Sequence, residues 1–519
     1  MKHARKLASL LLALVMVFAL ATTAFAANST AHTITVTGGK PGHTYSAYQV
    51  FKGDISDGKL TNIEWGDSVD GTAILAALKT GEGSAYAGCA SAEAVAAVLE
   101  GFRDDSAEID AFAKVVGAHL KTAAAGTSTA TQSSYTISVT GDGYYLVKDT
   151  GTIGTDDAAT KYLLKVIKDE TIAVKTTIPD VSKKILSSTR NEKGISAAVG
   201  QSVSFQLDSE VPSMDGYDTY TFKIHDTLSS GLTFNNDVVV KIDGTALTED
   251  TDYTVTVTEQ NITIEFLNMI NRKSAAGKEI EVTYSATVNN QALTKDKEDN
   301  TVHLEYSNNP GEGGTGTTQN KKVYVYDFDI VIDKWAQGSP SNIKLANAMF
   351  VLKNNEGKYY KYTAASGDNA AKVEWVAVTT EPETNDKTAE QIKAAWETCG
   401  VTVVTTDANG AAKFQGLATG NYYLKEIAAP AGYNLLKSDV AVNITATYND
   451  DGTLATTSAT VGENNGQYSQ SASVENKSGT QLPSTGGMGT TIFYVLGSIL
   501  VIGAVVLLVT KKRMSASDK

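Results

Sequence analysis

Lys334 has the surroundings that turn a lysine into a nucleophile. It follows Phe328, Ile330 and Ile332 at two-residue spacing, which puts its side chain on the apolar face of a predicted strand. Burial lowers the pKa of a lysine and favours the neutral amine, which is the nucleophilic form. The alternative is that the amine reaches towards solvent and only pairs with a carboxylate.

A later segment resembles the E-box of collagen-adhesin B-type domains. It reads Gly-Asn-Tyr-Tyr-Leu-Lys-Glu over 420–426, and Ala-Pro-Ala-Gly-Tyr follows over 429–433. In that family a lysine of the first strand and an asparagine of the last strand form an isopeptide bond beside the E-box glutamate. The resemblance implies Lys334 as donor, Glu426 as proton shuttle and Asn476 as acceptor. A protonated Glu426 is expected to polarise the Asn476 carbonyl while ammonia leaves.

Lys183 occupies a similar place earlier in the chain, where it alternates with Val181 and Ile185. The segment His-Asp-Thr-Leu over 225–228, followed by Gly-Leu at 231–232, resembles the catalytic-aspartate strand of A-type domains. The resemblance implies Lys183 as donor and Asp226 as proton shuttle.

The acceptor of this second set is expected on the last strand of its module. Apolar side chains alternate there up to Asn308, so the resemblance implies Asn308 as acceptor. Lys184 is a weaker candidate donor because it points to the opposite face, and Asn300 and Asn309 are weaker candidate acceptors.

The first part of the chain departs from this pattern. Its segment Gly-Tyr-Tyr-Leu-Val-Lys over 143–148 imitates the E-box but has Lys148 in place of the glutamate. We therefore predict no isopeptide bond there, which would make this module the most labile one.

A β-sandwich is the scaffold that positions such residues. Strand-like segments recur along the chain, and Asp-Gly or Asn-Gly pairs separate many of them. The pattern predicts an all-β fold of tandem immunoglobulin-like sandwiches, of collagen-adhesin A and B type by resemblance. Helical periodicity is confined to insertions that we expect to pack on a sandwich edge rather than to bind a partner; they lie at 75–79, 92–102, 109–120 and 388–396. Thr388 and Gln391 form a predicted capping box.

Shifts in composition divide the chain into five parts. We predict a signal peptide over 1–26, an N-terminal domain with a helical insertion over 27–174, an A-type domain over 175–322, a B-type domain over 323–478 and a sorting signal over 479–519.

The N-terminus has the features of a secretory signal peptide. Basic residues precede an apolar run over 7–21, and the small-x-small site Ala-Phe-Ala follows at 24–26. We expect export with cleavage after Ala26, rather than a buried N-terminal helix.

The C-terminus has three ordered parts. The first is Leu482, Pro483, Ser484, Thr485 and Gly486. An uncharged stretch over 487–510, long enough to cross a bilayer, and basic residues at 511–513 follow. The order resembles the sorting signal of sortase substrates, which implies cleavage between Thr485 and Gly486 and attachment to peptidoglycan.

The whole arrangement resembles the backbone pilins of Gram-positive bacteria. The resemblance implies that sortases, pilin-specific and housekeeping, join Thr485 to a lysine of the next copy in a polymer that also contains minor pilins. Lys175, at the first seam, is the predicted linking lysine, although the Tyr-Pro-Lys form of the pilin motif is absent and a solvated boundary charge is the alternative. A monomeric wall-anchored adhesin that binds a host or microbial ligand is the competing interpretation.

The composition argues against other classes of function. A net charge of -14 argues against nucleic acid as a partner, and two cysteines cannot staple several modules together. Six histidines without Cys/His clustering predict no metal site, and no cofactor is expected. The missing Gly-x-Ser-x-Gly and His-Glu-x-x-His motifs argue against a secreted hydrolase. Asp327, Asp329 and Asp333 alternate along a strand, and we interpret them as its outward face.

Overall fold

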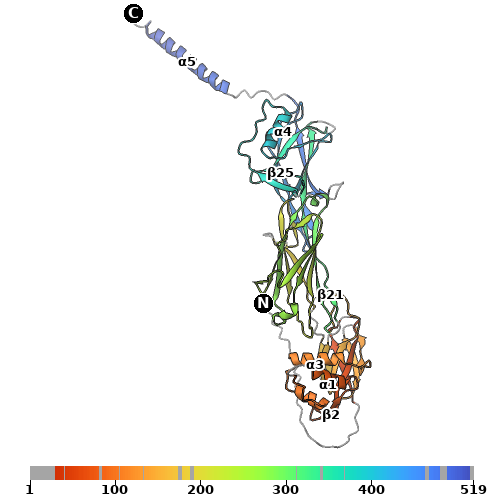
Figure 1. Cartoon of the computed structure of the whole chain (residues 1–519). Coiled ribbons are helices and arrows are strands. Elements are labelled where there is room, and N and C mark those ends of the chain that lie inside the picture. The colour runs from red at the N-terminus through yellow and green to blue at the C-terminus, as the bar shows by residue number, and fades with distance from the viewer. Residues whose placement is uncertain are drawn as a thin grey trace.

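Strands dominate the computed structural model, which confirms the predicted all-β fold (Figure 1). Figure 1 shows three β-rich modules in a row, with α1 and α3 in the N-terminal module and α4 in the C-terminal one. The structure describes residues 30–39, 41–80, 84–103, 106–131, 134–159, 161–173, 178–186, 192–310, 313–338, 343–367, 369–461, 467–479 and 488–514.

The first module is a sandwich with helices on one outer face. One sheet has the order β5-β6-β1-β9, and the other has the order β3-β2-β7-β8 with β4 beside β2. Its strands are β1 (Ala31–Thr37), β2 (Tyr45–Ser56), β3 (Lys59–Trp65), β4 (Gly126–Thr127), β5 (Thr129–Thr131), β6 (Ser134–Thr140), β7 (Gly143–Asp149), β8 (Lys161–Val166) and β9 (Glu170–Ala173). Its helices are α1 (Gly71–Leu78), α2 (Ala92–Leu99) and α3 (Ala107–Ala118). They fall where the periodicity predicts helix, and they cover the outer side of β2 and β7 through Phe51, Tyr144 and Leu146.

The second module packs two larger sheets. Their orders are β10-β12-β19-β15-β16, with β14 beside β19, and β11-β22-β20-β13-β18-β17, with β21 beside β20. The strands are β10 (Ser182–Leu186), β11 (Gly194–Ser196), β12 (Ser202–Glu210), β13 (Phe222–Leu228), β14 (Leu232–Phe234), β15 (Val239–Ile242), β16 (Thr245–Ala246), β17 (Tyr253–Thr258), β18 (Asn261–Phe266), β19 (Glu279–Val288), β20 (Glu298–Ser307), β21 (Thr315–Thr317) and β22 (Lys321–Tyr326). Two short 3-10 helices are η1 (Met269–Ala275) and η2 (Ala292–Thr294).

The third module is a smaller sandwich with one helical insertion. Its sheets have the orders β28-β23-β34-β33 and β26-β25-β24-β29-β30, with β27 beside β24, and β31 and β32 form a separate hairpin. The strands are β23 (Phe328–Ala336), β24 (Met349–Asn354), β25 (Tyr359–Thr363), β26 (Lys372–Val376), β27 (Val404–Thr405), β28 (Ala411–Leu417), β29 (Gly420–Ala428), β30 (Val440–Ile444), β31 (Ala446–Tyr448), β32 (Leu454–Thr457), β33 (Thr460–Val461) and β34 (Tyr468–Asn476). Helix α4 (Ala389–Thr398) begins at the predicted capping box of Thr388 and Gln391.

The second and third modules share backbone hydrogen bonds. Val199 N donates to Gly416 O at 3.0 Å, and Val373 N donates to Val199 O at 2.8 Å. A Cβ at Gly416 would lie 2.7 Å from a methyl carbon of Val199, so glycine permits this close approach. Because β22 pairs with β20, the middle sheet extends to Tyr326, and the expected boundary between 322 and 323 falls inside a strand.

Two aspartates at the start of β23 are buried, which corrects the expectation of an outward face. Asp327 and Asp329 are 3% and 1% exposed, whereas Asp333 is half-buried. The outer face of β23 is covered here by the neighbouring strand β28: Gly416 donates its N–H to Asp329 at 3.1 Å, and Lys413 Nζ lies 3.0 Å from the other oxygen. Gly416 also adjoins Val199 of the second module. Burial, reinforced by the charge of Asp329, raises the pKa of Asp327 to about 8.

Helix α5 (Met488–Met514) follows the third module in the chain. Within it, residues 493–513 are long and apolar enough to cross a membrane, with a mean hydropathy of 2.6 over the most apolar window. The predicted span is therefore a helix.

Candidate functional site

The buried lysine of the third module lies on the first strand, next to the last. Strands β23 and β34 are parallel, with Lys334 opposite Val474 and Ala336 opposite Asn476. Neither Lys334 nor Asn476 has any exposed surface. Because residues of equal parity share a face, the register sends both side chains into the same core.

Glu426 of β29 connects the two residues from the facing sheet. Its Oε1 lies 3.4 Å from Lys334 Nζ, and its Oε2 accepts a hydrogen bond from Asn476 Nδ2 at 2.9 Å. The backbone N–H of Leu436 also donates to Oε2, at 2.9 Å. One carboxyl group thus contacts both the amine and the amide nitrogen.

The surroundings favour the uncharged form of this lysine. Burial lowers the pKa of Lys334, and the charge of Glu426 opposes that effect. The Asn476 amide also donates to Asn434 O at 2.6 Å, while its buried Oδ1 has no hydrogen-bond partner among the described residues. Glu426 therefore contacts the amide nitrogen of Asn476 and not its carbonyl oxygen, which differs from the expectation that it polarises the carbonyl.

The second module brings Lys183 and Asp226 into direct contact. Lys183 Nζ donates to Asp226 Oδ2 and, at 2.8 Å, to the hydroxyl oxygen of Tyr284 on β19. The same hydroxyl accepts a hydrogen bond of 2.6 Å from Asn300 Nδ2. All these groups are buried, and Asn300 is fully so.

Burial shifts both charged groups towards neutrality. It lowers the pKa of Lys183 to about 8, against the opposing effect of Asp226, and it raises the pKa of Asp226. At pH 7 an amine with a pKa near 8 is neutral in about one molecule of ten. A neutral, nucleophilic form of Lys183 is therefore accessible at neutral pH.

The structure does not bring Asn308 to Lys183, which corrects the expected acceptor. Asp226 pairs with Val302 across β13 and β20, and Leu228 pairs with Asn300, so Asn300 lies at the Asp226 end of β20. Asn308 lies beyond the opposite end, where its Nδ2 faces Gly154 O of the first module at 3.5 Å. Both asparagines have the same parity, so alternation could not separate them.

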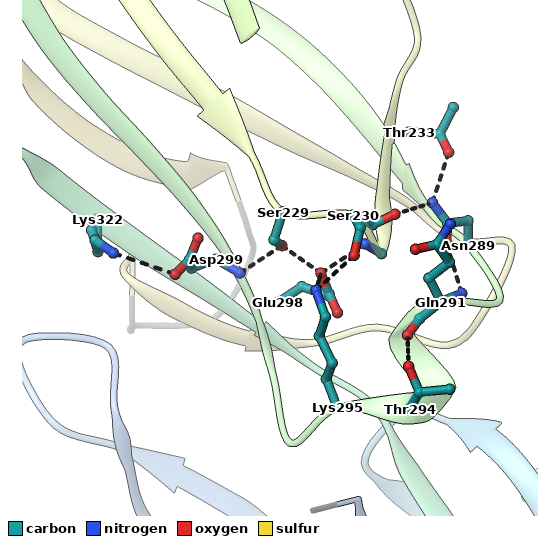
Figure 2. Close-up of polar contacts among 11 residues, drawn as sticks. Ser229, Ser230, Thr233, Asn289, Gln291, Thr294, Lys295, Glu298, Asp299 and Lys322 are labelled. Atoms are coloured by element: carbon teal, nitrogen blue, oxygen red, sulfur yellow. Dashed lines mark hydrogen bonds and ion pairs between the residues drawn. The ribbon is translucent and has the colours of Figure 1, made fainter. Parts of the chain in front are cut away.

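A buried carboxylate fixes the end of β20 that carries Asn300 (Figure 2). Glu298 Oε2 accepts hydrogen bonds from Ser229 Oγ and, at 2.8 Å, from Gly231 N, and Lys295 Nζ lies 3.6 Å away. Ser229 N also donates to Asp299 O at 2.9 Å. These contacts fasten the turn after β13 to the two residues just before Asn300.

Tyr284 is a residue that the sequence analysis missed. Its hydroxyl contacts both Lys183 and Asn300. Its alternation with Val282 and Ala286 on β19 marked it as a core residue. Nothing in the sequence distinguished it from other core tyrosines.

The first module has no glutamate at its E-box-like segment. Lys148 is half-buried on β7, while Asp149, one residue later, is buried. Lys175, the signal peptide over 1–26 and residues 482–486 lie outside the described residues.

Three protein-family models match parts of the chain. Residues 199–310 match the model described as Gram-positive pilin backbone subunit 2, Cna-B-like domain. Residues 334–460 match the SpaA prealbumin-like fold domain, and residues 474–515 match the LPXTG cell wall anchor motif. The middle module was expected to be A-type, whereas the matching model is described as B-like.

Two individual proteins and one solved structure also resemble this chain. The chain is 26% identical over 388 residues to the trypsin-resistant surface T6 protein of Streptococcus pyogenes, covering 66% of this chain and 70% of the relative. It is 32% identical over 119 residues to platelet adherence protein A of Streptococcus gordonii, of which it covers only 3%. The solved T6 backbone pilin of serotype M6 Streptococcus pyogenes superposes with a TM-score of 0.55 at 16% identity, covering 88% of this chain and all of that one, and it shares the modular three-domain fold. The chain is therefore a backbone subunit of Gram-positive pili that carries a cell-wall anchor.

Proposed function

We propose that this backbone pilin polymerises covalently and that two of its modules form internal Lys-Asn isopeptide bonds. The observation that carries the proposal is the double contact of Glu426, with one oxygen on the Lys334 amine and the other on the Asn476 amide nitrogen. A carboxyl group in this position can take a proton from the attacking amine and return one to the leaving nitrogen.

The reaction exchanges one bond for another. The neutral Nζ of Lys334 attacks Cγ of Asn476, and the Nζ–Cγ bond forms. The Cγ–Nδ2 bond then breaks, and Nδ2 leaves as ammonia with the proton that Nζ gives up through Glu426. Each isopeptide bond would form once in each chain, so the reaction is a single turnover and not enzymatic catalysis.

In the second module we assign Lys183 as donor, Asp226 as proton shuttle and Asn300 as acceptor. The Tyr284 hydroxyl supports this assignment because it contacts both the amine and the amide. Asp226 pairs directly with the amine and is buried with it, so it can accept the proton that the amine loses.

Assembly would use the C-terminal sorting signal and a lysine at the seam of the first and second modules. A sortase would cleave between Thr485 and Gly486 and pass the Thr485 carbonyl to Lys175 of the next copy, or finally to a peptidoglycan amine. The anchor motif and the apolar helix α5 support this order of events. The name of the Streptococcus pyogenes relative, a trypsin-resistant surface protein, agrees with cross-linked modules.

Intact-mass measurement of the exported chain tests the internal bonds. The protein should weigh less than its sequence predicts by two ammonia molecules, and a mass equal to the sequence mass would refute both bonds. A denaturing gel of wall extracts tests polymerisation: a ladder indicates a polymer, and a single band favours the monomeric adhesin.

A further inference from the structure

The loop that connects β7 to β8 lies against the second module. Three of its residues accept hydrogen bonds from the second module: Gly154 O from Asn308 Nδ2 at 3.5 Å, Thr155 O from Thr317 N at 2.5 Å and Asp157 O from the Tyr306 hydroxyl at 3.4 Å. In the other direction, Ala159 N donates to Asn308 O at 2.8 Å. We call residues 150–159 the joint loop.

His43 holds both ends of the joint loop. Its Nδ1 bonds to Asp149 Oδ2, where β7 ends, and its Nε2 lies 2.5 Å from Asp157 Oδ2. The imidazole and both carboxylates are buried, with exposed fractions of 7%, 5% and 7%. A ring between two carboxylates thus braces the loop from inside the first module.

The second oxygen of each carboxylate holds the loop backbone. Asp149 Oδ1 accepts from Gly151 N at 3.1 Å, and Asp157 Oδ1 accepts from Ala158 N at 2.8 Å. The shape of the loop therefore depends on where the two carboxylates lie, and His43 fixes both of them. Another side-chain contact across the joint, between Lys114 and Asp218, lies at the surface, where an ion pair adds little.

We infer that His43, as an imidazolium between Asp149 and Asp157, is the residue that locks the first module onto the second. Only the protonated ring donates from both nitrogens; a neutral ring would turn one lone pair towards a carboxylate. Losing the second donor would leave a buried carboxylate facing an acceptor, so the loop should relax away from Asn308 and Thr317. The first module, where no isopeptide bond is predicted, thus has an ion cluster that joins the end of β7 to the loop that follows it.

The lock should open as the pH rises. Burial lowers the pKa of His43, but the hydrogen bonds and charges of Asp149 and Asp157 outweigh it and raise the pKa above its ordinary value. A raised pKa means that the lock is complete below about pH 6.5 and is lost as the pH passes the raised value. The other groups near the cluster are Tyr45, whose ring stacks on His43, and Asp156 and Tyr306; burial raises the pKa of Tyr306 to about 12, outside this window.

Hydrogen-deuterium exchange, resolved by residue, tests the lock in the exported chain held in detergent through its C-terminal helix. In His43→Gln, the amides of Ala159 and Thr317, which donate across or onto the joint loop, should exchange at least about tenfold faster. The amides of Ile137 in β6 and Ile224 in β13 report on the two folded modules and should not change. His32→Gln is the matched control, because His32 is also buried and bonds to Asp142 at 2.7 Å, away from the joint loop.

Two results would overturn the inference. One is unchanged exchange at Ala159 and Thr317 in His43→Gln while Ile137 stays protected. If Ile137 also loses protection in His43→Gln, the unaltered protein provides the test. Its ratio of the amide exchange rate of Thr317 to that of Ile224 should rise between about pH 5 and about pH 9. A constant ratio would refute the lock.

Discussion

Lys334 and Asn476 lie on adjacent parallel strands, two positions apart in register, with Glu426 in contact with both side chains. The first and last strands of the module are thus neighbours at the point where a covalent tie would join them.

Glu426→Ala should abolish the bond of the third module because nothing then carries a proton from Lys334 to the leaving nitrogen. The intact mass should be higher than that of the unaltered protein by one ammonia molecule, beyond the change caused by the substitution. Glu475→Ala is the control, since Glu475 precedes Asn476 on β34 but is only half-buried. Equal ammonia loss in Glu426→Ala and Glu475→Ala would contradict the role of Glu426.

Asn300→Ala and Asn308→Ala distinguish the two possible acceptors of the second module. Removing Asn300 should prevent the bond and retain one ammonia, because its amide shares the Tyr284 hydroxyl with Lys183. Removing Asn308 should leave the loss of two ammonia molecules unchanged. It should only weaken the contact with Gly154. The opposite pattern of masses would restore Asn308 as acceptor.

Limited proteolysis should cut the first module well before the other two. A tie between distant parts of a module limits how far it can open, and opening is what exposes a chain to protease. The order of cleavage can be read from the masses of the fragments over time. Similar cleavage rates in all three modules would mean that the bonds are absent or give no such protection.

Asp327→Asn should reduce the pH dependence of stability. The folded protein binds a proton at Asp327 up to about pH 8, whereas the unfolded chain releases it near pH 4, so stability falls as the pH rises between those values. The slope due to this residue is at most about 1.4 kcal/mol per pH unit.

Thermal unfolding midpoints at several pH values measure this effect. An asparagine keeps an oxygen that can accept from Gln467 but cannot ionise. Asp333→Asn, a change at a half-buried position of β23, serves as control and should keep the slope. Identical slopes for the unaltered protein and Asp327→Asn would show that Asp327 is already ionised.

Changes at Thr485 and Lys175 should separate polymerisation from wall attachment. Thr485→Ala removes the acyl donor, so polymer and wall attachment should both disappear and the precursor should stay in the membrane through α5. Lys175→Ala should remove the ladder on a denaturing gel but leave single subunits on the wall, because the acceptor there is a wall-precursor amine. A ladder that persists in Lys175→Ala would indicate another linking lysine, with Lys184 the first candidate.

The sequence predicted those structural features that a local pattern of residues determines. Alternation alone placed Lys183 and Lys334 in the cores, and the E-box resemblance brought Glu426 and Asn476 together with Lys334. The helices also began close to where the periodicity indicated, with the capping box of Thr388 as predicted.

The sequence predictions that differ from the structure depend on strand register and on contacts between modules. Asn300 in β20 and Asn308 just beyond its end have the same parity, and only the pairing of β13 with β20 shows which of them lies near Asp226. Asp329 has the parity of an outward residue, but strand β28, at the joint with the second module, covers that face too. Neither fact has a local signal in the sequence, because both depend on segments far away in the chain.

The parallel pairing of β23 with β34 also decides how the third module would carry tension along a fibre. The chain enters at Phe328 and leaves after Asn476, at opposite ends of the paired strands, so a pull on the two ends loads all the ladder hydrogen bonds in shear rather than opening them one by one. With the proposed bond in place, the load would cross from Lys334 directly to Asn476. The intervening segment, with α4 and the E-box strand, would then bear no force, so insertions there could vary without weakening the fibre.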